Sequence, residues 1–160
     1  MPDQITVQPL HSAQLTTAAM LYKTVFNQAP WLESWTKSTA KKRLDFLFNM
    51  PSSFHLCILK NTKLLGFLIG YTEPYLDKTI LHLKELCIAP TSQNKGFATQ
   101  LLNQLESNCI KQNINAVYLS TKKTKTLTHF YTKNNYQSLD QHIIFFKDLP
   151  FGDTSLFKTV

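Results

Sequence analysis

The chain has 160 residues, 43% of them hydrophobic and 17% charged, which is ordinary for one soluble globular domain with a proper core. No stretch reaches the roughly 18 consecutive apolar residues of a membrane-spanning helix, and the N-terminus lacks the layout of a signal peptide, so we expect a cytoplasmic protein without a membrane partner. The net charge of +7 rests on sixteen lysines and one arginine, and this lysine bias says little about function, because arginine is the preferred residue for bidentate recognition of phosphates or bases. No recognised nucleic-acid-binding motif accompanies the charge, so we expect no nucleic-acid partner.

Hydrophobic periodicity predicts mixed strands and helices, hence the α/β (α+β) class. In chain order we expect a strand at 4–9, helices at 12–28 and 36–49, a hairpin of strands 54–60 and 64–71, a loop at 73–78, a strand at 80–89, a long helix to about 112, a strand at 116–120, a helix at 126–133 and a last strand at 141–147. Gly66 and Gly70 inside one strand indicate a bulge or a close backbone approach. Residues 1–148 are expected to form a single domain and 149–160 a C-terminal tail.

The run Gln93-Asn94-Lys95-Gly96-Phe97-Ala98 is the most informative part of the sequence. It follows an apolar strand and opens the long helix, so its backbone N–H groups have no partner inside the helix and can bind an anion. Gly96 allows close approach of the backbone to a phosphate, and Lys95 adds a positive charge. The pattern therefore favours a site for a pyrophosphate.

A second motif, His129-Phe130-Tyr131-Thr132-Lys133-Asn134-Asn135-Tyr136, follows about thirty residues later. Together the two motifs resemble the general N-acetyltransferase (GNAT) superfamily, whose pattern is Gln/Arg-x-x-Gly-x-Gly/Ala followed by Phe/Leu-Tyr-x-Lys-x-Gly-Phe. The matching residues are Gln93, Gly96, Ala98, Phe130, Tyr131 and Lys133, with Tyr136 in place of the final Phe. The resemblance covers roughly residues 54–147.

Two residues depart from the family pattern. Asn135 stands where the family has Gly, which is a mild change because Asn tolerates a left-handed backbone better than other non-glycine residues. Thr124 stands where many members have Asn, and this replacement removes an amide that could have met the cofactor arm.

The resemblance implies a mixed, twisted sheet of six to seven strands flanked by about four helices, with acetyl-CoA as the cofactor. In this family the pantetheine arm adds to the splayed strand, and the pyrophosphate lies on the turn before the long helix. The residues expected to bind acetyl-CoA are Leu86, Cys87, Ile88, Gln93, Asn94, Lys95, Gly96, Phe97, Ala98, Thr124 and Tyr131. A homodimer is a further expectation from the family.

Tyr131 occupies the position of the family's general acid. A phenol with a pKa of about 10 is protonated at neutral pH and can donate to the departing thiolate, although a tyrosine on an apolar helix face is often only part of the core. For the base we favour Glu85, because desolvation would raise the pKa of a carboxylate in an apolar stretch. His82 is the alternative, since its ordinary pKa is already suitable. Alternation separates these two side chains onto opposite faces unless a bulge intervenes.

The acceptor pocket is expected in the segment between the first two helices, where Trp31, Glu33 and Trp35 follow Pro30. The two tryptophans can form an aromatic wall for an amine, with Glu33 supplying attraction, or they can simply staple the two helices together.

Three other features carry less weight. The cysteines Cys57, Cys87 and Cys109 lie in apolar runs without metal-like spacing, so we expect buried small side chains and no metal; an acyl-carrying thiol at Cys87 is the minor alternative. The lysines at 122, 123 and 125 fit a solvated loop, electrostatic capture of coenzyme A, or a nucleic-acid contact.

These observations predict an acetyl-CoA-dependent N-acetyltransferase that moves an acetyl group directly to an amine acceptor, with a small molecule favoured over a protein or peptide amine. A non-catalytic acyl-CoA sensor and a nucleic-acid-binding module are the alternatives from other classes.

Overall fold

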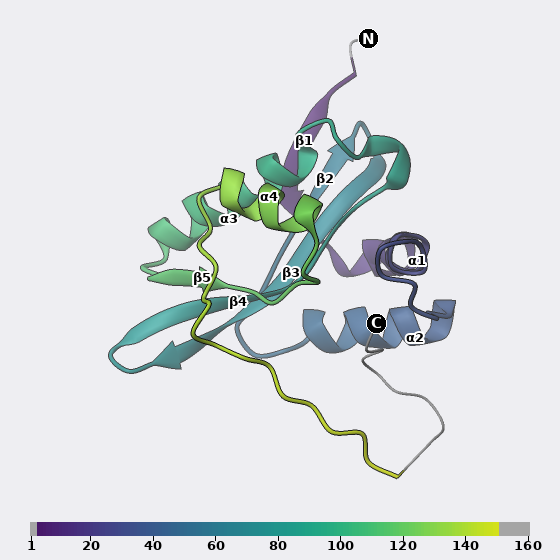
Figure 1. Ribbon diagram of the computed structural model, residues 1–160. Helices are drawn as coiled ribbons and strands as arrows, with labels where there is room; N and C mark the ends of the chain where they lie inside the picture. Colours follow the sequence, from purple (N-terminus) through teal and green to yellow (C-terminus); the bar gives the residue numbers. More distant parts are fainter. Residues whose placement is uncertain (1–2, 151–160) are drawn as a thin grey trace. The chain divides into compact units, whose positions relative to one another are not determined.

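The computed structural model describes residues 3–150, and the chain divides into two compact units, Met1–Thr124 and Lys125–Val160. The first unit is built on a sheet whose five strands, within the described residues, follow the order β1-β2-β3-β4-β5 (Figure 1). The strands are β1 (Ile5–Pro9), β2 (Ser53–Lys60), β3 (Lys63–Tyr75), β4 (Lys78–Ile88) and β5 (Ala116–Tyr118). Strands β1 to β4 are antiparallel and β5 is parallel to β4, so the sheet is mixed as expected.

Helices cover both faces of this sheet (Figure 1). The helices of the first unit are α1 (Leu15–Phe26), α2 (Lys37–Phe48) and α3 (Phe97–Lys111), with short 3-10 turns η1 (Ser12–Gln14) and η2 (Pro90–Ser92). Helices α1 and α2 share a core with Cys57, Phe67 and Ile69 of the strands, whereas the neighbouring strand residues point to the α3 side because side chains alternate along a strand.

The sequence predicted the strand ends less well than the strands themselves. Residues 73–78 are not a loop: β3 and β4 continue to Tyr75 and from Lys78, and only the residues between them form the turn. Leu76 takes a left-handed φ of 56° in that turn. Long antiparallel partners let both strands extend beyond the apolar run that marked them in the sequence.

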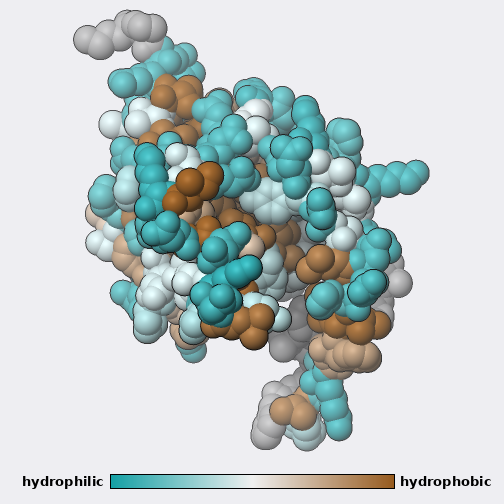
Figure 2. All heavy atoms as spheres, turned by 90° about the vertical axis from the view of Figure 1, so that its left-hand side faces the viewer, coloured by the Kyte–Doolittle hydropathy of each residue, from teal (hydrophilic) through white to brown (hydrophobic). Residues whose placement is uncertain are grey.

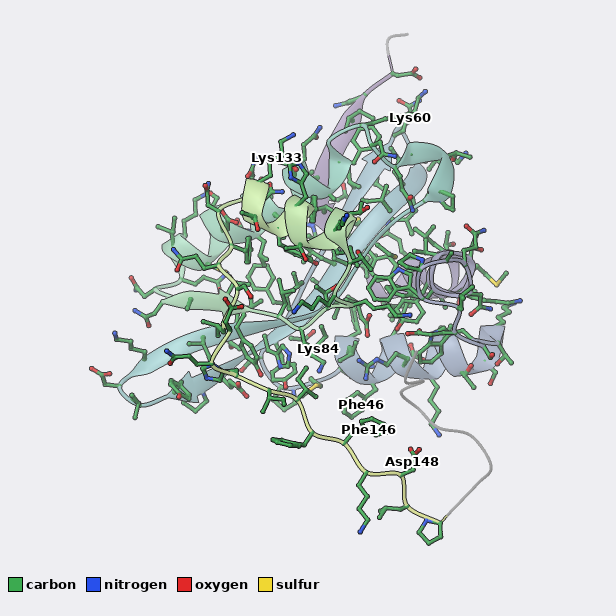
Figure 3. The ribbon with its side chains drawn as sticks, viewed as in Figure 1. Phe46, Lys60, Lys84, Lys133, Phe146 and Asp148 are labelled. Atoms are coloured by element: carbon green, nitrogen blue, oxygen red, sulfur yellow. The ribbon has the colours of Figure 1, made fainter. Side chains whose placement is uncertain are left out.

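The two strand glycines lie where β3 and β4 approach closely, as predicted. A Cβ at Gly66 would stand 2.6 Å from the carbonyl oxygen of Cys87, and a Cβ at Gly70 would collide with the carbonyl of His82. The register also shifts beside Gly70, which pairs with Leu83 while Ile69 pairs with Glu85. The residue between them, Lys84 (labelled in Figure 3), is therefore the extra residue of a β-bulge.

The second unit contains α4 (Lys125–Lys133) and an irregular segment up to residue 150. The strand predicted at 141–147 was wrong, because these residues have no regular secondary structure. Within residues 3–150 the sheet therefore has five strands rather than six or seven. Ile143, Ile144 and Phe145 are 74–84% exposed. Most of the tail predicted at 149–160 lies outside the described residues.

Hydrophilic side chains dominate the molecular face in Figure 2, with smaller hydrophobic areas between them, as on an ordinary protein surface. Among residues 3–150, no helix combines the length and apolar character that crossing a bilayer requires.

Candidate functional site

Strand β4 has an open edge next to the sheet's last strand. Its parallel pairing with β5 covers only Ile80–His82 against Ala116–Tyr118, and no described strand pairs with this side of residues 83–88. The N–H of Ala89 donates to Leu65 of β3 at 2.7 Å. Because backbone groups alternate in direction along a strand, the N–H groups of Leu86 and Ile88 face the open side. This edge can hydrogen-bond an extended ligand.

The open edge leads directly into the turn that the sequence singled out. The side chain of Gln93 donates back to the carbonyl of Ile88 at 3.1 Å, and the ammonium of Lys95 donates to the carbonyl of Thr91 at 2.8 Å. Asn94 and Gly96 take left-handed φ values of 59° and 80°. These contacts hold the loop in a fixed curve between β4 and α3.

The N-terminus of α3 is uncapped. Gly96 is the N-cap residue, and no side chain caps the first turn. Among the described residues, the N–H groups of residues 94–99 have no intramolecular acceptor. A Cβ at Gly96 would meet nothing within 4 Å, so the space beside this residue is open. Such a cluster of free N–H groups at the positive end of a helix is an anion site of the kind that holds a pyrophosphate.

The bulge at Lys84 changes which β4 side chains share a face. Glu85 pairs with Ile69 and His82 pairs with Tyr71, and residues 69 and 71 lie on one face of β3. Glu85 and His82 therefore lie on the same face, the one covered by α1 and α2, although simple alternation had separated them. A bulge in β4 is the exception to simple alternation, and the glycine that pairs beside it, Gly70, is its signal in the sequence.

Glu85 is only 7% exposed and is held by Arg43 of α2. The Nε and Nη2 atoms of Arg43 donate to Oε1 of Glu85 at 3.0 and 2.8 Å, and Tyr22 of α1 lies beside the same carboxylate. Burial raises the pKa of Glu85, while the charge and hydrogen bonds of Arg43 oppose that rise. Burial and the nearby carboxylate also raise the pKa of Tyr22. Sequence reasoning missed Arg43 and Tyr22, which no local pattern links to Glu85.

His82 lies among two tyrosines at the end of the β4–β5 pairing. Its Nδ1 is 2.9 Å from the Tyr118 hydroxyl and 3.2 Å from the Tyr71 hydroxyl, and its ring stacks on Tyr118 with centroids 4.1 Å apart. Burial, with a smaller effect of Lys84, lowers the pKa of His82 to about 4. A neutral His82 with Nδ1 accepting from a phenol follows from this arrangement. The sequence contained no signal that joined either tyrosine to His82.

Aromatic contacts and side-chain hydrogen bonds hold the segment between α1 and α2 in place. Trp31 contacts Phe26 and Trp35 contacts Tyr22, with centroids 5.1 Å apart in each pair. The Trp35 indole N–H donates to the carboxylate of Glu33, which is itself exposed. The side-chain amide of Asn27 exchanges hydrogen bonds of 2.9 and 2.8 Å with the backbone of Trp35. Both tryptophan rings therefore pack on residues of α1, and Glu33 remains open to solvent.

A lysine from the far end of the first unit reaches the same segment. The ammonium of Lys122 donates to the carbonyl of Pro30 at 2.6 Å, although 92 residues separate them. The N–H of Thr124 bonds back to the carbonyl of Lys122 at 3.0 Å. Residues 122–124, which follow β5, are thereby tied to the segment that we expected to form the acceptor pocket.

Tyr131 lies in α4 of the second unit. Its ring contacts Phe130 and Tyr136, with centroids 5.0 and 5.7 Å apart. Asn135 takes a left-handed φ of 64°, and the next residue's N–H closes the helix end by donating to the Tyr131 carbonyl at 3.0 Å. Burial raises the pKa of Tyr131 to about 12, so its hydroxyl stays protonated at neutral pH.

The three cysteines are buried and free, as the sequence predicted. Burial raises the pKa of each thiol, most strongly at Cys87, which is 3% exposed, and to about 11 at Cys109. A buried, protonated thiol is a poor nucleophile, which disfavours the acyl-carrying alternative at Cys87. Within residues 3–150, no group of three or more His, Cys, Asp or Glu side chains could hold a metal ion.

The fold is similar to those of several solved acetyltransferase structures. The fold is similar to that of a possible acetyltransferase from Clostridium difficile 630 (15% identity, TM-score 0.79, 91% of this chain and 98% of that chain covered). It is also similar to the aminoglycoside N-acetyltransferase AAC(6')-Iy in complex with CoA (11% identity, TM-score 0.73, 92% and 97% covered). A third structure is the aminoglycoside acetyltransferase meta-AAC0020 from an uncultured soil metagenomic sample in complex with sisomicin (17% identity, TM-score 0.72, 91% and 96% covered).

No curated protein matches the sequence. The family model described as "Acetyltransferase (GNAT) family" does match, over residues 20–136, which is more than half of the chain. That match includes the open edge of β4, the turn before α3 and the motif around Tyr131. The chain belongs to the GNAT family of acetyltransferases.

Proposed function

We propose that this protein is an acetyl-CoA-dependent N-acetyltransferase that transfers the acetyl group directly to an amine on a small molecule. The observation that carries the proposal is the continuity of the open β4 edge with the uncapped turn before α3. An extended pantetheine arm can add to the N–H groups of Leu86 and Ile88, and the pyrophosphate can bind the free N–H groups of residues 94–99. One ligand with both features is coenzyme A.

In the proposed reaction the amine nitrogen attacks the thioester carbonyl, the new C–N bond forms and the C–S bond breaks. The N–H of Ile88 polarises the carbonyl oxygen, because it faces the open side of β4. The Tyr131 hydroxyl gives its proton to the departing thiolate, and its raised pKa supports this role because the group remains protonated. The amine's surplus proton must leave to a base on the acceptor side.

For that base we favour His82 over Glu85. Glu85 is buried, and the Arg43 guanidinium is bonded to its carboxylate. The positive charge of Arg43 therefore already balances the carboxylate and makes it a poor proton acceptor. His82 lies at the end of the β4–β5 pairing and connects to the 39%-exposed Tyr118 through Nδ1. Its pKa of about 4 makes it a weaker base than an ordinary histidine, but it keeps the ring unprotonated at neutral pH and able to accept a proton. A proton can pass from the amine to Tyr118 while Tyr118 passes its own to His82.

Three features support an entry route for the acceptor amine between the α1–α2 segment and β4. Glu33 offers an exposed carboxylate, the Trp31 and Trp35 rings supply an apolar surface, and the His82 cluster lies on the face that α1 and α2 cover. Two of the similar structures are aminoglycoside acetyltransferases. Aminoglycosides such as sisomicin therefore belong in the first panel of acceptors, together with simple diamines and a short peptide with a free N-terminus.

The test is calorimetric titration of acetyl-CoA, with desulfo-CoA and ATP as controls, followed by the amine panel read out as free thiol. Binding of acetyl-CoA and desulfo-CoA but not ATP, with thiol release that depends on one small amine, is the expected result. Binding without release for any amine would instead identify an acyl-CoA sensor, and release only with the peptide would move the acceptor class to protein amines. Absence of acetyl-CoA binding would refute the proposal.

A further inference from the structure

The sheet ends at β5, whose outer edge no described strand covers. β5 stands last in the strand order, and its three residues pair only with β4 (Figure 1). The sequence predicts a longer strand here, at 116–120, and a further strand at 141–147. The structure shortens the first and leaves the second without regular secondary structure. Both differences have the same physical reason if each segment needs a neighbouring strand that a single copy does not provide.

The segment 141–147 has the composition of a buried strand. It contains Ile143, Ile144, Phe145 and Phe146 in succession. β-branched and aromatic residues are enriched in strands, and an unbroken apolar run fits a strand that is covered on both faces. Yet Ile143, Ile144 and Phe145 are 74%, 75% and 84% exposed. A contiguous apolar run on a protein surface, rich in β-forming residues and free of proline, marks a place where another chain binds.

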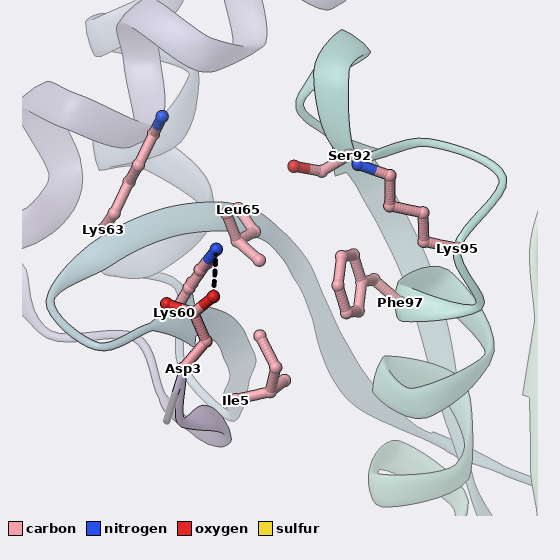
Figure 4. Close-up of a pocket in the computed structure, with 8 residues that line it drawn as sticks. All are labelled: Asp3, Ile5, Lys60, Lys63, Leu65, Ser92, Lys95 and Phe97. Carbon is pink, nitrogen blue, oxygen red and sulfur yellow. Dashed lines mark ion pairs between the residues drawn. The ribbon is translucent and has the colours of Figure 1, made fainter. Parts of the chain in front are cut away.

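The first and the last strand of the sheet differ in how their outer edges are protected. At β1 the ion pair of Asp3 with Lys60, at 2.7 Å, lies beside the start of the strand (Figure 4), and Pro9, which has no N–H, ends it. Charged side chains and proline are the means by which sheet edges avoid further strands. β5 consists of Ala116, Val117 and Tyr118 and contains neither. An added strand is therefore accepted at β5 rather than at β1.

We propose that the segment 141–147 of a second copy of this chain pairs with the outer edge of β5, and that two copies exchange these segments reciprocally. One chain carries both halves of the missing pair, an edge without a strand and a strand sequence without an edge. Because each copy uses the same two surfaces, the exchange closes as a twofold dimer and covers both edges. A phenylalanine side chain buries about 150–250 Å², so two exchanged segments with their isoleucines approach the roughly 1,200–2,000 Å² of a stable interface.

The exchange also brings the partner close to the candidate acceptor side. Neighbouring strands lie about 4.7–4.9 Å apart, so the added segment runs next to Tyr118, the last residue of β5. The Tyr118 hydroxyl lies 2.9 Å from Nδ1 of His82. The partner's segment therefore forms part of the surroundings of the His82 cluster, and turnover should fall when dilution separates the copies. This consequence rests on the proposed function, whereas the exchange itself does not.

The test is sedimentation velocity of the full chain over a wide range of concentrations, where the parent should reach the mass of two chains. The segment variant is Ile144→Pro, and the edge variant combines Ala116→Lys with Ser120→Pro, both at exposed positions. Each should weaken dimerisation at least about 100-fold, because proline removes a pairing N–H and lysine protects an edge. Leu139→Pro, a 62%-exposed position before the segment, is the matched control and should change nothing. Urea unfolding of the dilute variants shows that each is folded.

Mixing the two variants distinguishes exchange from other dimers. The segment variant keeps an intact edge and the edge variant an intact segment, so the mixture should form heterodimers although neither variant dimerises alone. The inference is wrong if the parent stays monomeric at every concentration, or if its dimer ignores Ile144→Pro. A dimer that Ile144→Pro weakens and the edge variant does not would mean that the two segments pair with each other, which also overturns it. A dimer that responds to both variants in a protein that does not bind acetyl-CoA would keep the exchange and refute only the proposed function.

Discussion

Replacing Arg43 by methionine tests whether Glu85 is a buried charge held by its partner or a free base. The substitution removes both hydrogen bonds to Oε1, of 3.0 and 2.8 Å, and leaves a 7%-exposed carboxylate without its cation. Breaking a buried ion pair by deleting one partner costs about 3–5 kcal/mol. Because the Arg43 side chain is itself 33% exposed, we expect the lower end, about 3 kcal/mol.

The assay is urea unfolding at several pH values. A loss of about 3 kcal/mol moves the midpoint by about 1.5 M if the slope is near 2 kcal/mol per molar urea. The matched control is Lys41→Met on the same helix, since the Lys41–Asp45 pair is also short, at 2.6 Å, but exposed on both sides. That control should cost less than about 1 kcal/mol.

The pH dependence has a definite sign. Burial already raises the folded-state pKa of Glu85, and without Arg43 the pKa rises further. The folded protein then binds a proton that the unfolded chain releases above its ordinary value of 4.5. Stability is therefore retained at low pH and lost as pH increases through the folded-state pKa, so the penalty of Arg43→Met should grow from pH 5 to pH 8.

Two results would refute this reasoning. If Arg43→Met lowers the free energy of unfolding no more than Lys41→Met does at any pH, the Glu85 carboxylate is not a buried charge that depends on Arg43. A double variant Arg43→Met with Glu85→Leu that stays as unstable as Arg43→Met alone would mean that the loss comes from packing. For turnover we expect Glu85→Gln to remain within a few-fold of the parent, whereas loss of a general base lowers kcat by about 10²–10⁴.

Three further predictions concern the proposed site. Tyr131→Phe should lower kcat by about 10²-fold or more with unchanged acetyl-CoA affinity, since it removes only the proton donor; equal turnover, with Tyr75→Phe as control, would remove Tyr131 from the mechanism. Gly96→Asp should weaken acetyl-CoA binding at least about 100-fold in calorimetry, because its charge opposes the pyrophosphate. Gly96→Ala, which has the same backbone strain at φ 80° but no charge, should weaken binding clearly less, and equal losses in the two variants would mean that backbone strain and not charge is responsible. Because the pKa of His82 is lowered to about 4, the folded protein loses stability as the pH falls from about 6.5 to 4. With allowance for the partial exposure of the ring, His82→Gln should reduce that loss by about 1–2 kcal/mol in urea unfolding. A pH profile that the variant leaves unchanged would contradict a neutral His82.

Local pattern was sufficient for most of the fold. Helices α1, α2, α3 and α4 and the first four strands appear in the periodicity of their own residues, and the family resemblance through Gly96 and Tyr131 is confirmed by the family match. The strand expected at 141–147 failed because an apolar run becomes a strand only when another strand pairs with it. That condition lies outside the segment itself.

The candidate site was predictable only where it is made of consecutive residues. The turn at residues 93–98 uses its own backbone N–H groups, so its sequence was enough to find it. Arg43 reaches Glu85 across 42 residues and Tyr118 reaches His82 across 36, and no spacing rule connects such pairs. The bulge at Lys84 decides which of them can share a face, and a single sequence indicated it only through Gly70.

The double hydrogen bond between Asn27 and the Trp35 backbone has a consequence for how the protein could be diversified. It closes residues 28–34 into a ring whose two ends are fixed to each other and not only to the helices. This loop can be replaced by loops of other length and composition, because the contact between Asn27 and Trp35 keeps the end of α1 and the start of α2 in place. Libraries that randomise residues 28–30 and 32–34 and preserve Asn27, Trp35 and the core contact of Trp31 should therefore alter acceptor choice with little loss of folding, whereas the same changes in an Asn27→Ala background should unfold more readily.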